Sequence, residues 1–149
     1  EKFKTSVFMN IDGDEYIYIK MGDKLDEINI PSKPLVEIDD NTVNNFEFSS
    51  DQNFVRKSTR WITPAVFPNI TPTITWTVIS SNSKFHDVPM LPFEILDQYP
   101  NLELDQLKLL SLQLFLQSGE YQSYFDSNFE SYKIKEDLIQ ESFTYYFEQ

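Results

Sequence analysis

The residues best suited to chemistry in this sequence do not form a familiar catalytic set. His86 is the only histidine, so a Ser-His-Asp triad would have to use it as the base. It lies in a proline-bounded connection, and no serine occupies a Gly-x-Ser-x-Gly elbow. We therefore interpret His86 as an exposed or structurally satisfied histidine rather than a catalytic base.

Clustered carboxylates offer a second kind of chemistry, cation binding. Asp12, Asp14 and Glu15 are close in sequence, but a calcium loop of EF-hand type needs alternating oxygen ligands, a glycine at its sixth position and a glutamate at its twelfth. Tyr16 follows these acids at once, so a charged hairpin tip is favoured. Residues 39–41 read as a loop, where a weak surface cation site stays open. We predict no metal site.

Other catalytic classes find no support in the residues. The chain has no cysteine, which excludes thiolate nucleophiles, disulfides and cysteine-ligated metals. Its three glycines, at positions 13, 22 and 119, are too far apart for a phosphate-binding loop. A glycosidase pair could be drawn from the 24 acidic residues, but the sequence does not indicate which two would converge. We predict a non-enzymatic protein without a cofactor.

A basic strip is the strongest candidate for a binding site. Residues 52–86 hold four bases and no acid, although the chain carries a net charge of −12. One interpretation is an edge strand whose charges prevent aggregation, and this is slightly favoured. A second is a strip that docks a protein partner, with a tryptophan as apolar anchor; a third is pairing with acidic helices of the same chain. The candidate partner-binding residues are Arg56, Lys57, Arg60 and Trp61.

Length and composition set the frame for these residues. A chain of 149 residues with 40% hydrophobic content predicts one folded, soluble domain over 1–149, β-rich in 1–100 and helical in 101–149. No apolar run approaches the roughly 18 residues that span a membrane. The absence of cysteine weakly indicates an intracellular location, cytoplasm or nucleus.

The first two-thirds of the chain read as strands. Asp12-Gly13 lies between two β-prone runs in "TSVFMNIDGDEYIYIK" and predicts a hairpin with a two-residue turn. Pro31 and Pro34 interrupt the next short strands. "PTITWTVIS" is the best strand in the chain, with Ile74, Trp76 and Val78 on one face, and we expect it to be a buried central strand.

The pattern changes after Asn101. Leucines recur at helical spacing up to Leu114, and Gly119 stands where a helix would end. Aromatic residues between Tyr121 and Tyr132 predict a second helix, and apolar residues from Ile134 onward predict a third. The predicted fold is α+β, an antiparallel sheet from the N-terminal two-thirds covered on one face by two or three C-terminal helices. The predicted core comprises Val7, Met9, Ile11, Ile74, Trp76 and Val78 from the sheet and Leu107, Leu110, Leu114, Phe125 and Phe129 from the helices.

Three functions remain after these exclusions. The preferred one is a protein-protein interaction domain or a subunit of a larger hetero-complex. The alternative is an acidic decoy, whose helical carboxylates imitate nucleic acid and bind a basic protein. An enzyme of unrecognised type is third. We expect protein partners, no direct nucleic-acid binding and no membrane binding, because the chain is strongly acidic.

Overall fold

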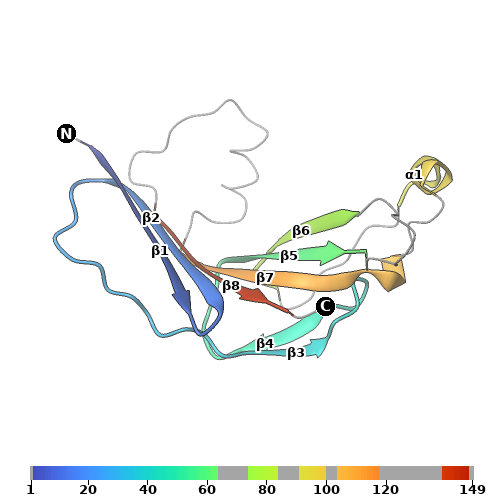
Figure 1. The fold of residues 1–149 in the computed structure, drawn as a ribbon, viewed down its shortest axis with the longest axis horizontal. Helices are drawn as coiled ribbons and strands as arrows, with labels where there is room; N and C mark the ends of the chain where they lie inside the picture. The colour runs from blue at the N-terminus through green and yellow to red at the C-terminus, as the bar shows by residue number, and fades with distance from the viewer. Residues whose placement is uncertain (1, 64–73, 84–90, 100–103, 118–138, 148–149) are drawn as a thin grey trace.

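The computed structural model describes residues 2–63, 74–83, 91–99, 104–117 and 139–147. Figure 1 shows these parts of the chain as a curved sheet with a smaller hairpin packed against it. The strands are β1 (Phe3–Ile11), β2 (Asp14–Gly22), β3 (Val36–Asp40), β4 (Glu47–Ser50), β5 (Arg56–Ile62), β6 (Thr75–Ser81), β7 (Lys108–Gln117) and β8 (Ile139–Tyr146). The remaining elements are the short helix α1 (Phe93–Gln98) and the 3-10 turn η1 (Leu104–Gln106).

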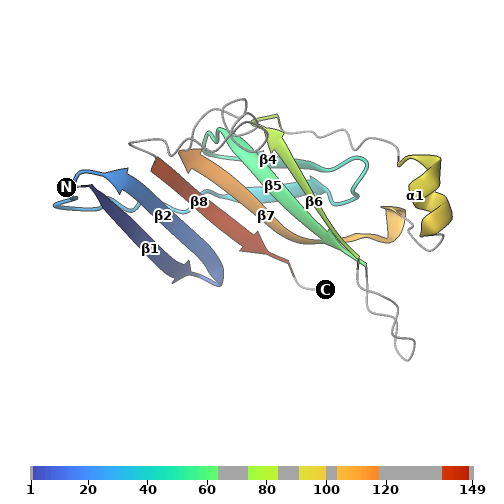
Figure 2. The same cartoon turned by 90° about the horizontal axis from the view of Figure 1, so that it is seen from above.

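Six of the strands form one antiparallel sheet in the order β1-β2-β8-β7-β5-β6. Figure 2 shows β1 along one edge of this sheet and β6 along the other. At the two edges of the sheet, strands that are consecutive in sequence pair with each other, β1 with β2 and β5 with β6. In the middle, β8 pairs with β2, so that Tyr16 lies opposite Phe143. The sheet therefore joins the two ends of the described chain through its middle strands.

The β1–β2 hairpin confirms the clearest local prediction. Phe3–Ile11 pairs with Asp14–Gly22 without a register shift. Asp12 and Gly13 both have positive φ angles, 53° and 87°, as a two-residue type I′ turn requires. The Asn10 side chain accepts a hydrogen bond from the Gly13 N–H at 3.1 Å, which further fixes the turn.

The hydrophobic core lies between one face of the large sheet and the β3–β4 hairpin. Phe46 meets the ring of Trp61 edge-on, with centroids 5.5 Å apart, and Phe48 packs beside Phe46. From the large sheet, Tyr16, Trp61, Leu112, Leu114 and Phe143 contribute fully buried side chains. Because strand side chains alternate between faces, this inner face leaves every second residue of each strand on the opposite, outer face.

The predicted α+β fold with two or three covering helices is wrong. Residues predicted to begin the first helix form η1 and then β7, and Ile139–Tyr146, predicted to belong to the third, forms β8. The chain is mostly antiparallel β, and the inner face is covered by the β3–β4 hairpin. The second predicted helix, Gly119, His86, Phe125 and Phe129 lie outside the described residues.

The strand positions also correct two predictions about residues 52–86, the segment without acidic residues. β5 was expected at an edge, but it pairs with β6 on one side and β7 on the other. β6 was expected to be central, but it is an edge strand. Its predicted facing is right, because Trp76 and Val78 pack against the core. Met9 does not belong to the core, being 38% exposed.

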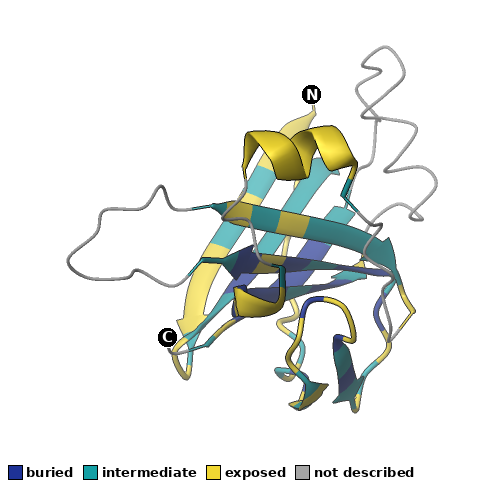
Figure 3. Cartoon of the chain, turned by 90° about the vertical axis from the view of Figure 1, so that its right-hand side faces the viewer, coloured by how far each residue is buried: buried dark blue, intermediate teal, exposed yellow. Residues whose placement is uncertain are grey.

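The helix α1 buries none of its residues, and Figure 3 shows it exposed along its length. No helix in the described part of the chain is long and apolar enough to span a membrane.

Candidate interaction surface

The four residues of the basic strip do not share one surface. They all lie on β5, where alternation directs Lys57 and Trp61 to the inner face and Arg56 and Arg60 to the outer face. Arg60 is exposed, whereas Arg56, Lys57 and Trp61 are buried. Of the predicted partner-binding set, Arg60 is thus the member that reaches solvent.

Trp61 is a core residue with a satisfied polar atom. None of its surface is exposed, and its indole Nε1–H donates a hydrogen bond to Thr59 Oγ1 at 2.9 Å. A buried indole usually needs such a partner. Trp61 therefore packs in the core and does not present an apolar anchor at the surface.

The two buried bases are held within the chain. The Arg56 guanidinium lies 3.4 Å from the ring centroid of Phe115, a cation–π contact across the β5–β7 pair. Lys57 Nζ donates a hydrogen bond to the Ser83 carbonyl and lies 5.5 Å from the Phe48 ring. Burial lowers the pKa of Lys57 to about 8, because desolvation disfavours the charged ammonium.

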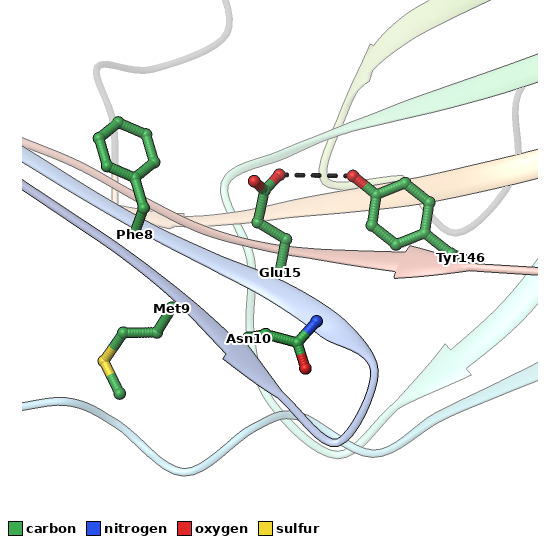
Figure 4. Close-up of a pocket in the computed structure, with 5 residues that line it drawn as sticks. All are labelled: Phe8, Met9, Asn10, Glu15 and Tyr146. Atoms are coloured by element: carbon green, nitrogen blue, oxygen red, sulfur yellow. Dashed lines mark hydrogen bonds between the residues drawn. The ribbon is translucent and has the colours of Figure 1, made fainter.

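An open pocket of about 320 Å³ lies where β1, β2 and β8 meet. Phe8 and Tyr146 line it with 63% and 54% of their surface exposed. Figure 4 shows Glu15 between these two aromatic side chains. The Tyr146 hydroxyl donates a long hydrogen bond, 3.4 Å, to Glu15 Oε2. Met9 and Asn10 complete the lining.

The electrostatics of this pocket link it to the basic strip. Burial and the Glu15 carboxylate raise the pKa of Tyr146, while the Arg60 charge opposes the rise. Arg60 pairs across the sheet with Ser111, which in turn pairs with Tyr146. Arg60 and Tyr146 therefore lie on the same outer face. Phe8 lies there too, because it pairs with Ile17, which pairs with Ser142 of β8. We call Phe8, Asn10, Glu15, Tyr146 and Arg60 the β1-side surface.

A polar cluster behind the pocket fixes the end of β8. Asp14 accepts a hydrogen bond from the Tyr146 backbone N–H at 3.1 Å and forms a 2.5 Å ion pair with Lys33. The Tyr145 hydroxyl donates to the Pro34 carbonyl at 2.7 Å. These contacts hold the segment around residues 33–34 against β8 and position Tyr146 at the pocket.

A buried polar pair lies on the inner face of the six-stranded sheet. The Tyr16 hydroxyl donates a 2.6 Å hydrogen bond to Glu141 Oε1, and both residues are buried. Burial, reinforced by Glu141, raises the pKa of Tyr16. The pair satisfies a carboxylate that would otherwise be costly to bury, so its role is structural.

The sequence patterns did not predict this pocket, although one signal for it is present. Alternation in the first strand placed Val7, Met9 and Ile11 on one face, which leaves Phe8 as a large apolar residue on the other. Tyr146 carries no comparable signal, because the apolar residues from Ile134 onward predict a helix there. Among the described residues, no group of three or more acidic or histidine side chains is arranged to hold a metal ion.

Comparisons with known proteins found no matching family model, no matching curated protein and no matching solved structure.

Proposed function

We propose that this chain is a non-enzymatic protein-interaction domain, or a subunit of a larger assembly, that binds other proteins through the β1-side surface. The observation that carries the proposal is the pocket lined by two exposed aromatic residues, Phe8 on the edge strand β1 and Tyr146 on β8. Aromatic residues and arginine are enriched at protein interfaces, where they supply most of the binding energy.

The geometry suits a protein partner better than a small molecule. The pocket is open to solvent, whereas small-molecule sites enclose most of their ligand. Its neighbour β1 presents backbone hydrogen-bonding groups along a sheet edge, to which an extended segment of a partner can add as a further strand. Phe8 then contacts the added strand, and Tyr146 contacts a part of the partner that also covers the outer face of β2 and β8.

Quantitative affinity capture tests this proposal. Phe8→Ser and Tyr146→Ser remove exposed aromatic groups and should leave the melting temperature nearly unchanged. Phe93→Ser on α1 is the matched control, since Phe93 is 77% exposed and lies away from the pocket. Proteins retained by the wild type and by the control should be lost from both pocket variants. Equal retention by all four chains, or turnover of a small molecule by a partner-free monomer, would contradict the proposal.

Arg60 contributes to the same surface as a rim charge. We expect Arg60→Glu to slow association with a captured acidic partner and to reduce its salt dependence, because rim charges act mainly on encounter. Folding stability should change little, because Arg60 is exposed. An unaltered association rate would restrict the surface to the aromatic pocket.

No observation on the described residues specifically supports the acidic-decoy alternative. It expected carboxylates on C-terminal helices, but residues 108–117 and 139–146 are strands. The described helix α1 carries Glu94 and Asp97, which is too short a run to imitate a nucleic-acid backbone.

A further inference from the structure

The edge of β1 has the features of a strand that accepts another strand. Among the described residues, β1 pairs with β2 alone. It has nine residues, contains no proline and shows no register shift. Proteins usually protect such edges with prolines, bulges or several charges, but Lys4 is the only charged residue within β1.

The hairpin geometry determines which backbone groups are available. A two-residue turn closes on a hydrogen-bonded pair, here Ile11 and Asp14. Hydrogen-bonded and non-hydrogen-bonded pairs then alternate along the ladder. The residues that direct their N–H and C=O groups away from β2 are consequently Lys4, Ser6, Phe8 and Asn10, and all four are exposed.

We propose that this edge binds a second copy of the same chain, β1 against β1 in antiparallel orientation, which joins two six-stranded sheets into one. This inference rests on the proposed function, because it names the partner of the β1-side surface. The register that pairs all nine residues sets Phe3 opposite Ile11 of the other copy and Val7 opposite Val7. In this register the outward-directed residues of the two copies face one another, as the ladder requires.

Charge and side-chain size both favour this pairing. Lys2 and Lys4 lie at the start of β1, and Asp12 lies in the turn that follows β1. Antiparallel pairing brings the basic start of each copy next to the acidic turn of the other. Phe8 lies opposite the small Ser6, and the two Phe8 rings become diagonal neighbours within reach of each other.

The cysteine-free sequence allows a direct test by single cysteine substitution. A non-hydrogen-bonded antiparallel pair holds its Cα atoms about 4.5 Å apart, within the range of a disulfide. Val7→Cys on the two-fold axis should therefore form a covalent dimer under mild oxidation. Met9→Cys is the matched control. Its two copies would lie four residues apart along the strand, about 13 Å at the usual rise, so it should not cross-link.

Proline substitution provides the complementary test. Ser6→Pro removes an outward N–H while leaving the β1–β2 ladder intact, which edge strands tolerate. Sedimentation equilibrium at about 0.15 M salt, where charge repulsion between copies is screened beyond about 8 Å, should show a reversible dimer for the wild type and Ser6→Ala. The Ser6→Pro chain should be monomeric with a nearly unchanged melting temperature.

The outcomes separate this inference from the proposed function. A wild type that is monomeric at the highest soluble concentration, or equal cross-linking of Val7→Cys and Met9→Cys, would overturn the self-pairing. Phe8→Ser losing captured proteins in that case would leave the proposed function standing with a different partner. Covalent Val7→Cys dimers, together with a monomeric Ser6→Pro chain, would establish the pairing of β1 with β1 of a second copy.

Discussion

At the residue scale, the two tryptophans, Trp61 and Trp76, differ in how far they are buried. They lie directly opposite each other on β5 and β6, but Trp61 is fully buried in the core and Trp76 is only partly buried at the edge strand. We expect Trp61→Ala to lower the free energy of unfolding by about 3–5 kcal/mol, as for other buried tryptophans.

Chemical denaturation of both variants checks this expectation. Trp76→Ala should cost clearly less, because part of the ring already faces solvent and a smaller cavity results. Similar losses of unfolding free energy at the two positions would contradict the difference in burial between Trp61 on the central strand β5 and Trp76 on the edge strand β6.

Lys57 gives the protein a pH-dependent stability. Its pKa is about 8 in the folded chain against an ordinary value of 10.5, so between these pH values the unfolded chain binds more protons. The free energy of unfolding should therefore rise with pH from about 8 toward 10. Above pH 10 the raised pKa values of Tyr16 and Tyr145 act in the opposite direction, because the unfolded tyrosines ionise first.

Lys57→Met isolates this contribution. Methionine keeps an unbranched side chain in the same space but cannot ionise. Urea denaturation at several pH values between 8 and 10 should show a rise for the wild type and a flatter profile for Lys57→Met. Parallel profiles for the two chains would mean that Lys57 keeps its ordinary pKa and is solvated.

At the scale of elements, the β1–β2 hairpin depends on its turn. Gly13 has a φ of +87° and an added Cβ would meet no atom within 4 Å, so the cost of Gly13→Ala comes from the backbone alone. We expect a loss of about 1–2 kcal/mol in unfolding free energy. Asp12→Asn should be nearly neutral, because asparagine also tolerates positive φ. A neutral Gly13→Ala, measured by denaturation, would contradict a type I′ turn.

This hairpin was predictable because its signals are local. Two adjacent residues specify the turn, and alternation over the flanking runs specifies the strands. β6 was predictable for the same reason, since Thr, Trp, Val and Ile favour strands.

β7 and β8 were not predictable from the same kind of signal. The β7 sequence "KLLSLQLFLQ" is buried on both faces, with Leu112 and Leu114 inside and Ser111 and Phe115 outside. A strand between two neighbours therefore lacks clean alternation, and its leucines also favour a helix. In β8, Phe143 and Tyr145 do alternate with smaller residues, but Ile134 and Leu138 before them suggested a helical period instead.

At the scale of the whole molecule, strand order decides what the candidate residues can do. The basic strip could be recognised from the sequence, but its burial depends on β7 pairing with β5 from about 50 residues further along the chain. The β1-side surface likewise forms because β8 inserts beside β2, which places Tyr146 on the same outer face as Phe8, with Glu15 of β2 between them. Neither neighbourhood is encoded in a local pattern.

Site-resolved amide hydrogen exchange tests the central claim, that the β1 edge and its pocket are the binding surface. Exchange would be measured on the dilute wild-type chain and again in the associated state, with the captured partner or at high concentration. The amides of Lys4, Ser6, Phe8 and Asn10 should exchange fast in the dilute chain and become protected on association. Those of Val7 and Met9, bonded to β2, should be protected in both. Unchanged exchange along β1, with new protection only elsewhere, for example on α1, would contradict the account.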